Sequence, residues 1–245
     1  MRMRQGWEEE AANWAAFART PGYDKAHQHY NLPAFLTLLP EAGAGTLDLA
    51  CGEGRLGRVL AGRGHRVAGI DAAPTMVRFA AGHQEAQPVV RGDAAVLPFR
   101  DEAFDLVVAY MCLHDIDAMP EAVAEAARVL RSGGRLCIAI PHPVNSAGGF
   151  PARDGDAPFM IAGSYLDPAP TDGVAERDGI RLTFHSEHRP LEAYSLALER
   201  AGLLIEAIRE LRVPDEFVQR DPAQRRWQRI PLFLHIRAVK ATVSR

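Results

Sequence analysis

One stretch of the sequence decides the fold: Thr46-Leu47-Asp48-Leu49-Ala50-Cys51-Gly52-Glu53-Gly54. Residues 46–50 are mostly apolar and predict a short buried strand, and the two glycines after them predict a tight turn. Leu56, Val59 and Leu60 then share one face of a helical repeat. The stretch therefore predicts a strand, a glycine turn and a helix in direct succession.

The same alternation continues along the chain. Apolar runs and helical periodicity predict further strands and helices at residues 65–71, 75–81, 88–91, 104–110, 119–130 and 135–140. Short connections between strands and helices force parallel pairing and place helices on both faces of the sheet. Two later apolar runs, 203–211 and 231–239, are expected to be strands six and seven. The predicted fold class is α/β, with a doubly wound, mostly parallel, seven-stranded sheet.

Two regions depart from this alternation. Residues 1–45 are predicted to be helical and precede the first strand, so we expect them to form an N-terminal lid. Residues 145–190 are rich in Pro and Gly, and Asp178-Gly179 between two strand-like runs is a hairpin signal. The prediction is a single domain over 1–245: a lid at 1–45, a core at 46–144, a small antiparallel cap at 145–190, and the rest of the core at 191–245.

Composition limits the function classes. The chain has 245 residues, of which 47% are hydrophobic and 24% charged, as expected for a globular protein with one large core. A net charge of -3 gives no electrostatic footprint for nucleic acid, and no run approaches the roughly 20 apolar residues of a membrane span. Three cysteines make no disulfide framework. We therefore expect a cytoplasmic protein with a small-molecule partner.

The charge around the glycine turn indicates the kind of ligand. In a doubly wound sheet, ligands bind at the carboxyl ends of the strands, where this turn falls. Residues 52–57 also fit the dinucleotide pattern G-x-G-x-x-G, with Asp71 about 20 residues further on, which favours NAD as an alternative. However, Asp48 and Glu53 flank the turn and would repel a diphosphate. A cationic ligand fits better, and S-adenosylmethionine carries both an ammonium and a sulfonium.

Five segments resemble the motifs of class I S-adenosylmethionine-dependent methyltransferases. They occur in the family's order and lie at residues 48–54, 69–71, 91–99, 104–108 and 130–136. The resemblance covers about residues 45–140, and the remainder of the chain is similar to the small-molecule branch in outline only. Ala50 departs from the pattern, because many members have glycine there, and it slightly narrows the room for the methionyl part of the cofactor.

The resemblance implies an enzyme that uses S-adenosyl-L-methionine and releases S-adenosyl-L-homocysteine. It implies that Asp48 positions the ammonium, Asp71 binds the ribose and Asp93 accepts from the adenine amino group. Further cofactor contacts are implied at Tyr30, Ala50, Cys51, Gly52, Gly54, Ala72, Met76, Ala94, Tyr110 and Met111. Packing roles suit Tyr30 and Met76 equally well.

Methyl transfer mainly requires alignment of the acceptor, the methyl group and the sulfur. An acceptor that must lose a proton would also need a base, and His114 and His142 are the catalytic candidates, with His114 first. The alternative roles are structural: a hydrogen bond that fixes the loop for His114, and shaping of the pocket for His142. No metal is predicted, because His185 and His188 would point to opposite faces of a strand.

The acceptor class stays broad at this stage. The sequence at 109–112, Ala-Tyr-Met-Cys, lacks the Asn-Pro-Pro-Tyr pattern of enzymes that methylate the nitrogens of nucleic-acid bases or of glutamine. We expect transfer to an oxygen, nitrogen or carbon atom of a small metabolite. The alternatives are an NAD-dependent oxidoreductase and a protein that binds S-adenosylmethionine without catalysis, because fold alone does not fix function.

Overall fold

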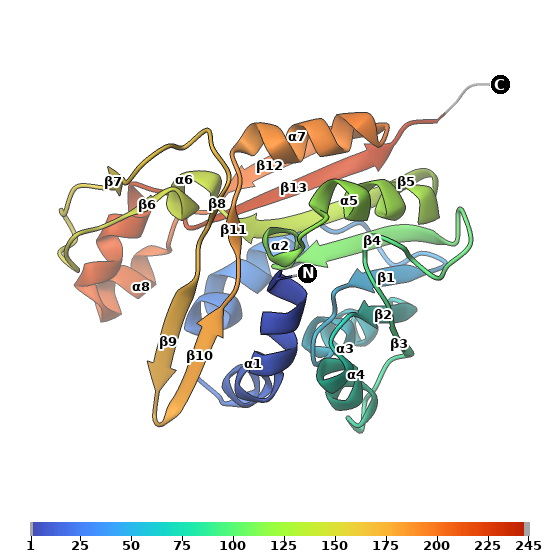
Figure 1. The fold of residues 1–245 in the computed structure, drawn as a ribbon, viewed down its shortest axis with the longest axis horizontal. Helices are drawn as coiled ribbons and strands as arrows, with labels where there is room; N and C mark the ends of the chain where they lie inside the picture. The colour runs from blue at the N-terminus through green and yellow to red at the C-terminus, as the bar shows by residue number, and fades with distance from the viewer. Residues whose placement is uncertain (1, 243–245) are drawn as a thin grey trace.

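The computed structural model describes residues 2–242 and has one seven-stranded sheet at its centre (Figure 1). The strand order is β12-β13-β5-β4-β1-β2-β3. The strands are β1 (Thr46–Leu49), β2 (Val67–Asp71), β3 (Val89–Arg91), β4 (Phe104–Tyr110), β5 (Leu130–Pro141), β12 (Leu203–Glu210) and β13 (Phe233–Lys240). Strand β13 runs antiparallel to the other six strands, which are parallel to one another. The predicted doubly wound, mostly parallel sheet is confirmed.

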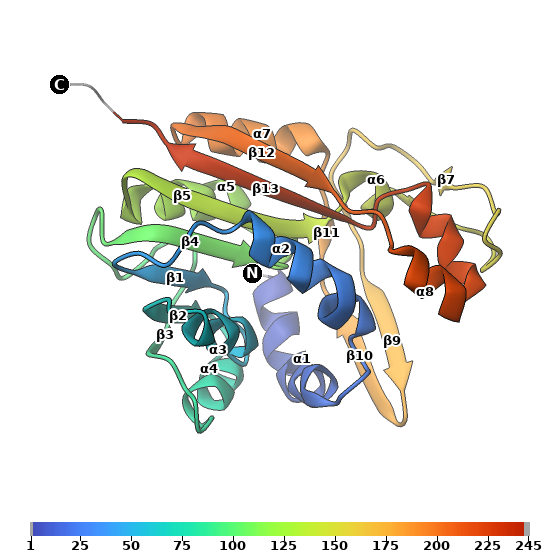
Figure 2. The same ribbon diagram turned by 180° about the vertical axis from the view of Figure 1, so that it is seen from behind.

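Helices cover both faces of this sheet. Helices α5 (Met119–Val129) and α7 (Leu191–Arg200) lie on the face toward the viewer in Figure 1, and α2 (Leu32–Leu38) lies on the opposite face, seen in Figure 2. Helix α3 (Arg55–Gly62) packs with α2 in the same apolar cluster.

Strand β4 shows why the sheet needs cover on both sides. Val107 and Ala109 belong to the cluster that contains α5 and α7, whereas Leu106 and Val108 belong to the cluster that contains α2 and α3. All four side chains are 2% exposed or less. Successive side chains of a strand point to opposite faces, so an unbroken apolar run must be buried on both sides.

The strand order reverses at β1. This strand pairs in parallel with β2 on one side and with β4 on the other. The connection through α3 therefore leads one way along the sheet and the later connections lead the other way. A crevice at the carboxyl ends of the strands is expected at such a reversal, and the glycine turn follows β1 at this edge.

The N-terminal segment is helical, as predicted. It comprises α1 (Arg2–Arg19), a π-helical turn η1 (His27–Asn31) and α2. Helix α1 packs against α4 (Pro74–Ala81) and against β10 (Ile180–Phe184). Figures 1 and 2 both place α1 beneath the sheet edge, between α4 and the β9–β10 hairpin.

The hairpin of the region 145–190 is also found. Strand β9 (Gly173–Arg177) pairs antiparallel with β10 across Asp178-Gly179. Both turn residues have positive φ, 47° and 81°, as a two-residue hairpin turn requires. The other strands here are two residues long: β6 (Gly148–Gly149), β7 (Met160–Ile161), β8 (Ala169–Pro170) and β11 (Glu187–His188).

Two local features differ from the sequence prediction. Strand β5 begins at Leu130, before the expected start at 135, because Leu130 pairs with Phe104 and the register then shifts. The charged segment between β12 and β13 contains α8 (Asp215–Arg220) and η3 (Pro222–Gln228), where no helix was predicted. Phe217 and Trp227 explain this, since they pack in an apolar cluster around buried Val213.

Candidate functional site

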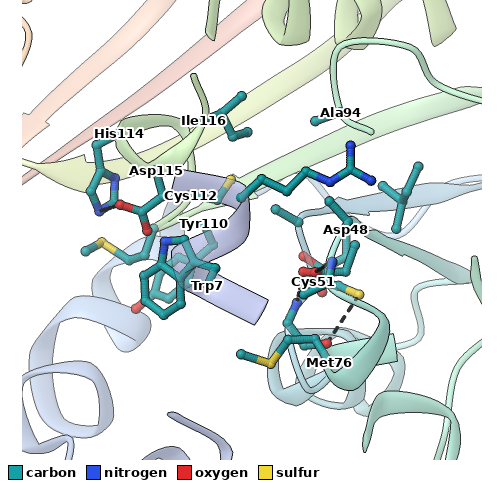
Figure 3. Close-up of a pocket in the computed structure, with 18 of the residues that line it drawn as sticks. Trp7, Asp48, Cys51, Met76, Ala94, Tyr110, Cys112, His114, Asp115 and Ile116 are labelled. Carbon is teal, nitrogen blue, oxygen red and sulfur yellow. Dashed lines mark hydrogen bonds and ion pairs between the residues drawn. The ribbon is translucent and has the colours of Figure 1, made fainter. Parts of the chain in front are cut away.

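A cavity of about 560 Å³ lies at the carboxyl ends of β1, β2 and β4 (Figure 3). The glycine turn and the residues after β2 line one part of it, and the short helix η2 (Leu113–Asp115) lines another. Trp7 and Trp14 of α1 and Phe184 of β10 complete the walls. Its volume lies within the roughly 300–1,000 Å³ of typical small-molecule sites.

The turn after β1 leaves open space for a ligand. Gly52 and Gly54 have φ values of +57° and +83°, and Ala50 also lies in the left-handed region at 51°. A Cβ added at Gly52 would meet no atom closer than Trp14 Nε1 at 3.9 Å. The turn is held by Cys51 N–H, which donates to Ile70 O at 2.9 Å. The backbone angle at position 52 thus favours glycine, and the space beside it stays free.

One oxygen of the buried Asp48 carboxyl group lacks a hydrogen-bond partner in the described part of the chain. The Asp48 side chain comes from the end of β1, lines the cavity and is 2% exposed. Among the residues described, its Oδ2 accepts no hydrogen bond. Burial, and secondarily the nearby Asp71 carboxylate, raises the pKa of Asp48 to about 7. A cation brought beside it would lower that pKa and satisfy the free oxygen.

Glu53 corrects one step of the sequence argument. We expected both Asp48 and Glu53 to attract a cationic ligand, but Glu53 is already paired within the protein. Its buried carboxylate binds Arg58 at 2.8 Å and Arg19 at 2.9 Å. A buried carboxylate needs such partners. The charge available to a ligand at the turn is therefore that of Asp48.

The acid at the end of β2 braces the glycine turn. Asp71 Oδ2 accepts from Gly52 N–H at 2.8 Å, and Oδ1 accepts from Ala73 N–H at 2.9 Å. Asp71 also lines the cavity, with Ala72 beside it and buried Met76 one helical turn further on. Met76 both lines the cavity and packs on Ala73, so its two proposed roles coexist.

Asp93 and Ala94 line the same part of the cavity. Asp93 Oδ1 accepts from Ala95 N–H at 2.9 Å, which fixes the carboxylate in a tight turn. Its Oδ2 lies 3.4 Å from Arg4 Nη1 of helix α1, in a half-exposed ion pair. The loop after β3 is therefore in contact with the N-terminal helix.

Tyr110 and Met111 at the end of β4 also line the cavity. The Tyr110 hydroxyl is 3.0 Å from His27 Nδ1, and burial raises the Tyr110 pKa. Met111 has φ 55°, an uncommon backbone conformation for its residue type. Such conformations concentrate at ligand sites.

Tyr30, Gly54 and His142 lie outside the cavity wall, unlike the other expected site residues. Tyr30 is buried against Phe217 and Phe233, with ring centroids 5.4 and 5.7 Å away. His142 Nε2 is 3.0 Å from Glu210, and its Nδ1 accepts from Val144 N–H at 3.1 Å. Both His142 nitrogens are engaged in structural contacts, so the structure supports its alternative, structural role.

His114 and Asp115 lie side by side on η2 and line the cavity. His114 Nε2 is 3.4 Å from Asp115 Oδ1, which also accepts from Ser186 Oγ–H at 2.7 Å. Burial lowers the pKa of His114 to about 3 and raises that of Asp115 to about 8. Both groups are therefore held neutral at pH 7.

Sequence reasoning missed several residues of helix α1 and its neighbours. Trp7 and Trp14 line the cavity, and their seven-residue spacing was the available signal, since it places both on one helix face. Arg55 also lines the cavity, pairs with Asp24 at 2.9 Å and lies 5.0 Å from the Trp14 ring centroid. No local pattern in the sequence predicts these contacts of Arg55.

Comparisons with known proteins agree with this geometry. Residues 47–138 match a family described as "Methyltransferase domain". A solved S-adenosylmethionine-dependent methyltransferase from Mesorhizobium loti is 26% identical, with a TM-score of 0.70 over 84% of this chain and 96% of that one. Residues 47–138 are therefore similar in sequence to a methyltransferase domain, and the fold of most of the chain is similar to that of a solved S-adenosylmethionine-dependent methyltransferase.

Curated relatives match about half of this chain. A demethylmenaquinone methyltransferase from Tropheryma whipplei is 33% identical over 47% of this chain and 49% of that protein. A malonyl-[acyl-carrier protein] O-methyltransferase from Salmonella typhimurium is 32% identical over 49% of each. The matched part thus spans about half the length of these relatives.

Two further observations concern residues 2–242. In this part of the chain, no helix is both long and apolar enough to cross a bilayer. Nor does it bring together three His, Cys, Asp or Glu side chains in a group that would hold a metal ion.

Proposed function

We propose that the protein transfers a methyl group from S-adenosylmethionine to an oxygen, nitrogen or carbon atom of a small molecule. One observation carries the proposal: the glycine turn places the unpartnered Oδ2 of buried Asp48 at the wall of a ligand-sized cavity. An unsatisfied buried polar atom costs about 1–3 kcal/mol, so a cationic ligand at this position is favoured. The ammonium of S-adenosylmethionine supplies that cation.

The other residues of this end of the cavity fit the rest of the cofactor. We assign Asp71 to the ribose hydroxyls. Its oxygens already accept two backbone N–H groups, but a carboxylate has about four acceptor positions, so it can accept further hydrogen bonds. Asp93 and Ala94 are placed for the adenine edge, and Met76 for its face. Bound there, the cofactor would supply a methyl group on a sulfonium, whose transfer forms a bond to the acceptor as the carbon–sulfur bond breaks.

His114 is the proposed general base. Its Nε2 faces Asp115 Oδ1, an oxygen that already accepts from Ser186, so we assign the ring proton to Nε2 and a lone pair to Nδ1. Nδ1 can then take the proton that a hydroxyl or amine acceptor loses on methylation. Asp115 Oδ1 would accept a hydrogen bond from Nε2–H of the resulting imidazolium.

The lid and the cap complete the proposal. Helix α1 and the β9–β10 hairpin supply Trp7, Trp14 and Phe184 to the cavity, so we assign residues 1–45 to a lid and the segment 145–190 to a cap over the acceptor. The three cysteines are free thiols, which fits a reducing compartment and a cytoplasmic location. A small-molecule acceptor, rather than nucleic acid, is the proposed partner.

Product analysis tests the proposed activity. The protein would be incubated with S-adenosylmethionine carrying a deuterated methyl group and a panel of small hydroxylated, amino and carbon-acid acceptors. We expect S-adenosylhomocysteine to form together with one acceptor that gains the labelled methyl group. Tight S-adenosylmethionine binding without any product across the panel would instead support a non-catalytic binding protein.

A further inference from the structure

Polar side chains also mark the end of the cavity opposite the glycine turn. Trp7, His114 and Asp115 are grouped there in Figure 3, whereas Asp48 and Cys51 lie at the other end. The first three come from α1 and η2, which are distant in sequence. The cofactor proposed above accounts for none of these three groups.

Two atoms at this end are buried without a hydrogen-bond partner. Residues 2–242 contain four such side-chain nitrogens or oxygens, and three of them belong to cavity residues: Trp7 Nε1, Asp48 Oδ2 and His114 Nδ1. Asp48 is matched by the cofactor ammonium in the proposed function. Trp7 Nε1 and His114 Nδ1 remain, and leaving each one unpaired costs about 1–3 kcal/mol.

The two remaining atoms have opposite requirements. The indole Nε1–H of Trp7 only donates, so it requires an acceptor atom. His114 Nδ1 carries a lone pair when Nε2 holds the proton toward Asp115 Oδ1, so it requires a donor. A hydroxyl group satisfies both at once, since its oxygen accepts and its hydrogen donates.

The charge balance at this end favours a neutral ligand. The cation beside His114 and Asp115 is Arg189, whose guanidinium donates to the carbonyls of Leu113 and Ile116 and pairs with Glu187. These partners occupy it, which leaves an anionic acceptor group without an evident counterion. Burial raises the pKa of Asp115 to about 8, so a negative ligand next to it would raise that value further.

The walls around these polar atoms are flat and apolar. Trp7 and Phe184 meet edge to face with ring centroids 6.3 Å apart, and Trp14 lies 6.2 Å from Phe184. Ile116 and Met111 also line the cavity. Aromatic walls of this kind favour a planar ligand with a large apolar area.

We propose that Trp7 and His114 form a binding site for the hydroxyl group of a neutral, flat, apolar acceptor. Trp7 Nε1–H donates to the hydroxyl oxygen, and the hydroxyl hydrogen donates to His114 Nδ1. This inference rests on the proposed function and narrows it to O-methylation of a hydroxyl: the new oxygen–carbon bond forms as the carbon–sulfur bond breaks, and the hydroxyl proton passes to His114 Nδ1.

The test uses calorimetry on the full-length protein saturated with S-adenosylhomocysteine. The probes are 2-naphthol, 2-methoxynaphthalene, which accepts but does not donate, and 2-naphthoate, which is an anion. We expect 2-naphthol to bind roughly tenfold tighter than 2-methoxynaphthalene and tighter still than 2-naphthoate, because each buried hydrogen bond of about 1–3 kcal/mol corresponds to such a factor.

Three variants assign the effect to named atoms. His114→Phe should reduce the tenfold preference for 2-naphthol over 2-methoxynaphthalene to near unity. If the methoxy group were excluded only by its size, the preference would persist in this variant. Trp7→Phe keeps an aromatic ring but removes the donor, and should weaken 2-naphthol several-fold. Trp227→Phe, a matched change outside the cavity wall, should leave the discrimination unchanged.

The same titrations separate the two proposals. S-adenosylhomocysteine is titrated first into the wild type and every variant, and its retained binding also shows that a variant is folded. If it fails to bind the wild type, the proposed function fails. If S-adenosylhomocysteine binds, any of three results overturns the hydroxyl site alone: 2-naphthol does not bind, it binds no more tightly than 2-methoxynaphthalene, or it binds more weakly than 2-naphthoate.

Discussion

The two ends of the cavity are built in different ways. The cofactor end consists of strand ends and the turns after them, so Asp48, Asp71 and Asp93 are fixed by one parallel sheet. The acceptor end is assembled from α1, η2 and β10, which meet only in the folded chain. We infer that the sheet determines how the cofactor is bound, while α1, η2 and β10 determine which acceptor is bound.

The largest expected effect tests the acceptor end. His114→Ala should lower turnover of the identified acceptor by roughly 10²- to 10⁴-fold, the usual contribution of a general base. Affinity for S-adenosylhomocysteine, measured by calorimetry, should change less than twofold, because His114 lies at the other end of the cavity. His83→Ala, at a position outside the cavity wall, is the matched control. Equal turnover in the two variants removes the base role.

The next effect tests the cofactor end. Asp71→Ala removes the proposed ribose contacts and releases Gly52 N–H from its carboxylate partner. We expect about 2 kcal/mol of lost binding energy, or roughly thirtyfold weaker S-adenosylhomocysteine binding. Asp167→Ala, at an exposed position outside the cavity, should bind like the wild type. A near-wild-type affinity for Asp71→Ala would contradict the placement of the ribose.

A smaller effect concerns pH at the cofactor end. In the free protein, burial and the nearby Asp71 raise the Asp48 pKa to about 7, whereas a bound ammonium would lower it. Below pH 7, binding must therefore release a proton, and affinity should fall by up to about tenfold per pH unit, with no such fall above pH 7.

Calorimetry in buffers of different ionisation enthalpy measures that proton directly. We expect up to about one proton released at pH 6 and almost none at pH 8. Asp48→Asn is nearly isosteric and does not titrate, so it should bind more weakly and lose this pH dependence. Identical proton release in Asp48→Asn would place the titrating group elsewhere.

The smallest effect concerns the link between the two ends. Helix α1 contacts the cofactor side through Glu8 with Thr75, at 2.6 Å to the hydroxyl, and through Arg19 with Glu53. S-adenosylhomocysteine should therefore slow hydrogen exchange in α1 by several-fold and affect the β9–β10 hairpin less. Unchanged exchange in α1 would remove its role as a lid over the cofactor.

Much of the fold was predictable because its signals are local. Residues adjacent in sequence are enough to predict that the apolar run at β4 is buried and that the chain turns at the glycines after β1. The Asp178-Gly179 turn is likewise a two-residue signal, and the hairpin was found there. Helix α8 was not predicted, because its formation depends on Phe217 packing against residues far away in the chain.

The same distinction between local signals and tertiary contacts applies to the residues of the candidate site. Asp48 and Asp71 stand in local motifs, and the structure brings both to the cavity. Glu53, Tyr30 and His142 have their actual partners elsewhere in the chain: Arg19, Phe233 and Glu210, respectively. Tertiary contacts of this kind leave no pattern in a single sequence. The electrostatics of His114 and Asp115 also depend on burial that only the folded chain provides.

The most direct test of the account is a calorimetric titration of the wild-type protein with S-adenosylmethionine and, separately, with NAD. The unpartnered Oδ2 of Asp48 at the glycine turn predicts saturable binding of S-adenosylmethionine, with one molecule per chain, and no detectable binding of NAD. Saturable binding of NAD without binding of S-adenosylmethionine would contradict it.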